Sequence, residues 1–178
     1  DGSLEGLQKL GHYELLHGIT SICPASMTLP EEQLLTICQT AAEYARQLKA
    51  LAAVQAPSSL PPCAELVGIH LEGPFISPAK KGAQKESNIV PPSAVLFEKL
   101  WEASDGLLKI ITMAPETDSA LAFIREFSDR VHISVGHTAA DYDTAALAFD
   151  AGADHLTHLF NAMNPLHHWN PGPIGAAF

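Results

Sequence analysis

Short apolar runs alternate along this chain with longer amphipathic stretches. The apolar runs have the length of β-strands, and polar turns containing glycine or proline bound many of them. The longer stretches carry apolar residues three and four positions apart, which is typical of helices with one buried face. This pattern predicts strands at 18–23, 64–72, 107–116, 130–138 and 154–163, and helices at 30–54, 93–104, 117–129 and 139–153.

The alternation indicates an α/β fold with a parallel sheet, because parallel neighbours must be joined by crossover segments that are usually helices. About five βα units fit the chain. An open doubly wound sheet and a TIM-type (β/α)8 barrel are both compatible with the pattern. Neither GxGxxG nor GxxxxGK[ST] occurs, which disfavours nucleotide-binding versions of the open sheet.

Composition and charge exclude several classes of protein. The 178 residues are 47% hydrophobic and carry a net charge of −10, so we expect one ordinary core and no nucleic-acid partner. No apolar run is long enough to span a bilayer, and the first residues lack the basic and apolar regions of a signal peptide. The widely spaced Cys23, Cys38 and Cys63 form no disulfide framework. We therefore expect reduced thiols, no membrane partner and a cytoplasmic location.

Three predicted strands end in residues that commonly bind metals. Glu72 lies in HLEGP, His137 in SVGHT and His158 in LTHLFNAM. The carboxyl ends of parallel strands converge on one face, where the chemistry of such folds takes place. One carboxylate and two imidazoles suit a divalent ion such as Zn²⁺ or Fe²⁺ and leave positions open for water. Each residue alone is also typical of a structural role, but together they predict a metal site.

Other polar residues are less strongly indicated as metal ligands or catalytic groups. His70 shares a strand face with Glu72, and we expect it to support a metal ligand by hydrogen bonding. His155 is expected on the strand face opposite to His158 and therefore in a structural role. The available acids Asp141, Asp143 and Asp154 are predicted to lie at helix N-termini or in turns rather than at strand ends.

Three longer motifs resemble a known family. GIHLEGPFISPAKKGAQ, SVGHTAA and THLFNAMNPLHH…PGPIGAA are similar to segments of the N-acetylglucosamine-6-phosphate deacetylases, members of the amidohydrolase superfamily. The resemblance covers nearly the whole chain. It implies a TIM-type barrel, a metal-dependent hydrolase that removes acetate from an N-acetylated amino sugar phosphate, and a homodimer. It also implies that Glu72, His137 and His158 bind the metal and that Ala83, Gln84, Asn161 and Ala162 contact the substrate.

Two positions depart from the family pattern. Gln84 stands where the family usually has histidine, and Trp169 stands at the position of a phosphate-binding arginine. A tryptophan cannot make a bidentate phosphate contact, but its ring can stack on a sugar, so we place Trp169 among the substrate-binding residues. An unphosphorylated amino sugar is therefore a second candidate substrate. The motifs are also compatible with activity on N-acetylgalactosamine 6-phosphate, with a dihydroorotase-like amidohydrolase and with a non-catalytic sugar-binding relative.

The resemblance also concerns length. It places a first HxH metal motif before Asp1 and the catalytic aspartate beyond Phe178. A closed barrel needs eight βα units, whereas about five are recognisable in this chain. We therefore expect residues 1–178 to be the central part of one hydrolase barrel, with no catalytic residue of their own and no activity in isolation.

Overall fold

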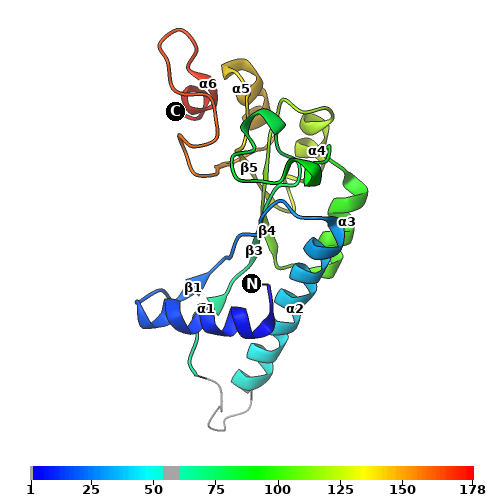
Figure 1. Cartoon of the computed structure of the whole chain (residues 1–178), viewed down its shortest axis with the longest axis vertical. Helices are drawn as coiled ribbons and strands as arrows, with labels where there is room; N and C mark the ends of the chain where they lie inside the picture. The colour runs from blue at the N-terminus through cyan, green and yellow to red at the C-terminus, as the bar shows by residue number, and fades with distance from the viewer. Residues whose placement is uncertain (1, 54–60) are drawn as a thin grey trace.

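The computed structural model describes residues 2–53 and 61–178, and it has the expected parallel α/β architecture (Figure 1). A small sheet pairs β1 with β2, and a larger one has the order β3-β4-β5-β6 with every pair parallel. The strands are β1 (Ser21–Ile22), β2 (Glu65–Leu66), β3 (Ile69–Glu72), β4 (Leu108–Met113), β5 (His132–Val135) and β6 (His155–Leu156).

Helices connect most of the strands. In Figure 1, α1 and α2 lie at the end that carries β1, α3 and α4 follow along one side, and α5 and α6 pack together at the other end. Two short 3-10 turns, η1 (Pro78–Lys80) and η2 (Glu86–Asn88), shape the long connection after β3. The helices are α1 (Leu4–Leu16), α2 (Glu31–Ala53), α3 (Ala94–Ala103), α4 (Ala120–Phe127), α5 (Tyr142–Asp150) and α6 (Gly172–Ala177).

Most predicted elements are confirmed, with shorter ends. The predicted strand 64–72 is wrong as one element, because it is divided into β2 and β3, which belong to different sheets. Gly68 lies at the break, where a Cβ atom would come within 2.3 Å of the Lys109 side chain. Residue 54, the predicted end of the helix that begins near residue 30, lies outside the described residues.

Two helices were not predicted. Helix α1 begins after Ser3, whose hydroxyl accepts a hydrogen bond from the Gly6 amide at 3.0 Å and caps the first turn. Helix α6 falls after the last predicted strand, in a segment whose many prolines and glycines are typical of a loop, but its last residues are helical. Its buried residues and its packing on α5 explain why a sequence with poor helix propensity is helical there.

The core lies between the larger sheet and the helices, and it includes a cluster of aromatic rings. The Phe97 ring lies 4.3 Å from the Phe127 ring and 5.5 Å from the Phe123 ring, measured between centroids. Phe75, in the connection after β3, meets Phe123 edge to face. This cluster anchors α3 and α4 behind the strands that carry the candidate site. Among the described residues, no helix has both the length and the hydrophobicity needed to cross a membrane.

The thiol of Cys38 should resist alkylation in the folded protein. Cys38 is fully buried in α2, and burial raises the pKa of its thiol to about 12. At about pH 8 the reactive thiolate is therefore scarce and out of reach. Treatment with iodoacetamide followed by peptide mass spectrometry should leave Cys38 unmodified until urea is added. Partly exposed Cys63 is the internal control, and equal labelling of both residues without urea would contradict the expectation.

Candidate metal centre

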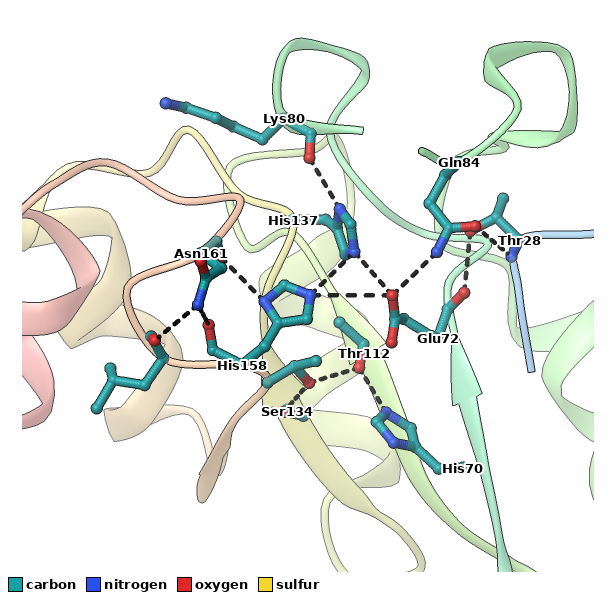
Figure 2. A network of polar contacts seen from close by, with 12 residues as sticks. Thr28, His70, Glu72, Lys80, Gln84, Thr112, Ser134, His137, His158 and Asn161 are labelled. Atoms are coloured by element: carbon teal, nitrogen blue, oxygen red, sulfur yellow. Dashed lines mark hydrogen bonds and ion pairs between the residues drawn. The ribbon is translucent and has the colours of Figure 1, made fainter. Parts of the chain in front are cut away.

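The three predicted metal ligands meet at the carboxyl ends of neighbouring strands (Figure 2). Glu72 is the last residue of β3. His137 and His158 each lie two positions beyond the end of a strand, after β5 and β6 respectively. Both histidines have positive φ angles, 48° and 36°, a conformation that costs energy in residues other than glycine. These turns direct both imidazoles toward Glu72.

One atom from each residue points into a common space. Glu72 Oε1 lies 2.9 Å from His137 Nε2 and 3.8 Å from His158 Nε2. The two Nε2 atoms are 3.1 Å apart. All three candidate ligand atoms lie within 4.8 Å of one another. Within the described part of the chain, this is the single cluster of metal-binding side chains of this kind.

In His137 and His158, the hydrogen bond at Nδ1 determines whether Nε2, the nitrogen that faces Glu72, carries a lone pair. His137 Nδ1 lies 2.8 Å from the Lys80 carbonyl oxygen, and His158 Nδ1 lies 3.0 Å from that of Asn161. A carbonyl oxygen only accepts, so each Nδ1 must carry a proton. In the neutral rings, both Nε2 atoms then offer lone pairs, as does the Glu72 carboxylate. Converging lone pairs with no proton between them fit a cation, so these residues form a possible metal-binding triad.

Charge within the triad shifts two pKa values. The hydrogen bond with His137 lowers the pKa of Glu72 despite partial burial, and the nearby charges of both histidines lower it further. Burial lowers the pKa of His137, but its bonds to Glu72 and to the Lys80 carbonyl and the charge of Glu72 outweigh burial and raise it. Without a cation, a proton between Glu72 and His137 is thus favoured. Proton and metal compete for the same lone pairs.

Glu116 holds the backbone of the turn that carries His137, and the sequence analysis missed it. Its carboxylate accepts hydrogen bonds from the Thr138 hydroxyl and the Ala139 amide, both at 2.5 Å. The same signal that identified Glu72 was available for Glu116, because each carboxylate ends a predicted apolar strand. Glu116 is not a member of the triad, and it fixes the backbone next to one of the members.

Loss of the hydrogen bonds that Glu116 makes to the turn after His137 should weaken metal binding. Replacing Glu116 with alanine frees the turn after His137, and removal of groups that orient metal ligands commonly costs about 10- to 100-fold in affinity. Calorimetric titration of the intact protein with Zn²⁺ would measure the change. Asp118→Ala is the matched control, because it removes an exposed carboxylate from the same connection. Equal losses in both variants would argue against a specific role for Glu116.

The predicted substrate contacts lie in two connections beside the triad. Asn161 is exposed next to His158, and its side-chain amide donates to the carbonyls of His158 and Leu159 at 3.3 Å. The Ala162 carbonyl accepts from the Thr138 amide at 3.1 Å, which joins the turns that carry the two histidines.

Gln84 and its neighbour Ala83 lie in the connection after β3. Ala83 is exposed. Gln84 is only 3% exposed, and its amide faces Glu72 rather than open solvent (Figure 2). The family resemblance implied that both residues contact the substrate, but it did not reveal that Gln84 contacts a triad member.

Trp169 has a different setting from the other predicted substrate contacts. Its side chain is 85% exposed on the loop before α6. Its ring lies 4.6 Å from that of His168 and 5.9 Å from that of His167, measured between centroids. Among the described residues, no ring contact or hydrogen bond joins Trp169 to the triad.

A row of hydrogen-bonded polar side chains crosses the sheet below the triad. His70 Nε2 lies 2.6 Å from Thr112 Oγ1, and Thr112 Oγ1 lies 2.7 Å from Thr157 Oγ1. Ser134 Oγ continues the row, 2.6 Å from Thr157 Oγ1 and 2.8 Å from His155 Nδ1. His70 thus contacts a hydroxyl rather than a metal ligand, and His155 has the structural setting expected of it.

Comparisons with known proteins agree with the family resemblance of the sequence motifs. No family model matches the chain. It is 51% identical over 115 residues to an N-acetylglucosamine-6-phosphate deacetylase of Bacillus subtilis, a match covering 64% of this chain and 29% of the relative. The crystal structure of such an enzyme from Pasteurella multocida is 30% identical with a TM-score of 0.81, covering 99% of this chain and 43% of that one.

A second solved structure contains a substrate. A mutant of the Mycobacterium smegmatis N-acetyl-D-glucosamine-6-phosphate deacetylase, in complex with N-acetyl-D-glucosamine-6-phosphate, is 37% identical with a TM-score of 0.76. The match covers 90% of this chain and 38% of that one. The chain therefore spans less than half the length of these relatives. Its parallel strands and helices correspond to part of a TIM-type barrel.

Proposed function

Because the chain matches a segment of the N-acetylglucosamine-6-phosphate deacetylases, we propose that the whole protein is a metal-dependent amidohydrolase of this kind. The reaction is hydrolysis of the linear amide bond of N-acetylglucosamine 6-phosphate, which yields glucosamine 6-phosphate and acetate. The observation that carries this proposal is the convergence of Glu72 Oε1, His137 Nε2 and His158 Nε2 at the strand ends.

The triad provides a negative carboxylate and two neutral imidazoles for a divalent ion, with Zn²⁺ and Fe²⁺ as the candidates. When bound, such an ion supplies Lewis-acid activation of water and of the acetamide carbonyl. The chain's own residues hold the ligand atoms in place through the carbonyls of Lys80 and Asn161. Asn161 and Ala162, on the turn after His158, are proposed to orient the sugar.

We assign no general base within residues 1–178. Asp141 caps α5 by accepting from the Thr144 amide at 2.9 Å, and Asp143 lies in the first turn of the same helix. Asp154 Oδ2 is hydrogen-bonded to His132 Nδ1 at 2.6 Å. All three acids therefore have structural settings, and we propose that the proton-transfer residue belongs to another part of the whole protein.

Partners are proposed from the family resemblance, and the location is proposed from the free cysteines. The substrate is a small amino sugar phosphate, and the family resemblance leads us to propose a homodimer. The free state of Cys23, Cys38 and Cys63 supports a cytoplasmic location. Residues 1–178 are proposed to be the central part of a single barrel that is inactive in isolation.

Metal analysis and turnover of the intact protein test the proposal together. We expect at least one divalent ion per subunit and acetate release from N-acetylglucosamine 6-phosphate. A metal-loaded protein that binds this sugar without releasing acetate would favour a non-catalytic relative. A protein that holds no metal would contradict the proposed centre itself.

Trp169 favours an unphosphorylated amino sugar as a second candidate substrate, because an exposed indole offers a stacking surface and no positive charge. If so, Trp169→Arg should raise the ratio of kcat/KM for the phosphorylated over the free sugar by about 10- to 100-fold, the value of a hydrogen-bonded charge pair. Trp169→Phe keeps the aromatic face and serves as control. A strong preference of the unmodified protein for the phosphorylated sugar would overturn this candidate.

A further inference from the structure

Gln84 connects the candidate metal ligand Glu72 to the protein backbone. Its Nε2 atom donates to Glu72 Oε1 at 2.9 Å, and its Oε1 atom accepts from the Thr28 amide at 2.8 Å. The orientation of the side-chain amide follows from its neighbours, since a backbone N–H needs an acceptor and a carboxylate needs a donor. Gln84 is only 3% exposed, so its amide has little contact with water. Loss of either hydrogen bond would leave a buried polar group without a partner, which costs free energy.

Thr28 is a fixed anchor for this connection. Its hydroxyl donates to the main-chain carbonyl of Glu72 at 2.9 Å, and its own carbonyl accepts from Asn88 Nδ2 at 3.1 Å. Gly73 makes the close approach possible, because a Cβ atom there would lie 2.1 Å from Thr28 Oγ1. Thr28 thus holds Glu72 at two points. Its hydroxyl binds the Glu72 main-chain carbonyl directly, and its amide holds the Glu72 carboxylate through the side chain of Gln84.

The Glu72 oxygen that accepts the hydrogen bond from Gln84 is Oε1, the same atom that faces both imidazoles. A carboxylate can otherwise rotate about its last torsion, which has broad minima. We propose that Gln84 is a positioning residue for the metal centre, holding Glu72 Oε1 toward His137 and His158 through the backbone of Thr28. This inference rests on the proposed metal-binding function of the triad.

The role differs from direct contact with a sugar. Both ends of the Gln84 amide are engaged with protein groups, and its side chain is buried. A neutral amide also keeps its hydrogen-bond direction at every pH at which the protein is folded, which an imidazole does not. Gln84 therefore suits a fixed structural link between loop and ligand.

Cobalt binding by the intact protein tests the inference without an activity assay. Gln84→Met keeps the length of the side chain but has no strong donor or acceptor, and we expect it to weaken Co²⁺ affinity about 10- to 100-fold. The visible absorption of bound Co²⁺ should also change, because it reports the geometry of the ligands. Gln47→Met is the matched control, since the Gln47 amide donates to Glu43 of the same helix, at a distance from the triad.

The outcomes separate this inference from the proposed function. If the unmodified protein and Gln84→Met bind Co²⁺ with equal affinity and equal spectra, the positioning role is wrong and the metal centre stands. If the unmodified protein binds no Co²⁺, both the metal centre and the positioning role are wrong. Should circular dichroism show Gln84→Met to be unfolded, Gln84→Asn decides. It keeps a buried amide that is one methylene too short to join Thr28 to Glu72, and the same loss of affinity is expected.

Discussion

Replacing Glu72 with alanine in the intact protein should abolish metal binding by the triad and the proposed deacetylase activity together. Glu72 contributes the single negative charge of the triad, and its Oε1 atom lies within 3.8 Å of both His137 and His158 Nε2 atoms. Without it, two imidazoles remain, and they compete poorly with water for a divalent ion. Because Lewis-acid activation lowers the barrier by several kcal/mol, kcat/KM should fall by about a thousandfold or more.

Elemental analysis and acetate release, measured on the same preparations, check this expectation. Glu65→Ala removes an exposed carboxylate from β2 and should leave both quantities unchanged. A Glu72→Ala protein that keeps its metal would show that the ion is bound elsewhere. One that loses metal but keeps turnover would show that the hydrolysis does not depend on this centre.

Replacing Phe97 with alanine should have the largest effect on stability, about 3–5 kcal/mol of the free energy of unfolding. Phe97 is fully buried and contacts the rings of Phe123, Phe127 and Trp101. The guanidinium of Arg130 also lies 5.4 Å from the centre of its ring. Its removal would leave a cavity between α3, α4 and the sheet that these rigid neighbours cannot fill.

Urea denaturation of the intact protein, with metal present at a fixed concentration, measures this loss. Val95→Ala on the same helix is the control, because its side chain is 69% exposed and its removal should change stability by less than about 0.5 kcal/mol. A loss below about 1 kcal/mol for Phe97→Ala would indicate that the aromatic cluster repacks around the vacancy.

The repeating strands and the triad were predictable from sequence because both follow from local patterns. Buried parallel strands produce apolar runs, and the strand ends bring Glu72, His137 and His158 to one face whatever lies between them. The order of the larger sheet also follows the order of the chain, so neighbours in sequence are neighbours in space.

Two of the features that were missed, helix α6 and the role of Gln84, depend on contacts between segments that are apart in the chain. Helix α6 is helical through its packing on α5, which no propensity of its Gly- and Pro-containing sequence indicates. The link from Gln84 to the Thr28 amide joins positions 56 residues apart in the chain. Such a bond leaves no periodic signal in the sequence, and the family resemblance pointed to a sugar contact instead.

The row of polar side chains below the triad imposes a rule on its protons. Four hydrogen bonds join His70, through the hydroxyls of Thr112, Thr157 and Ser134, to His155. Each bond needs one hydrogen, and three hydroxyls supply three of them. The fourth must come from a ring nitrogen, so His70 and His155 cannot both accept. Two histidines on opposite edges of the sheet are therefore linked: if either ring accepts, the other must donate, and all three hydroxyls must donate toward the accepting ring.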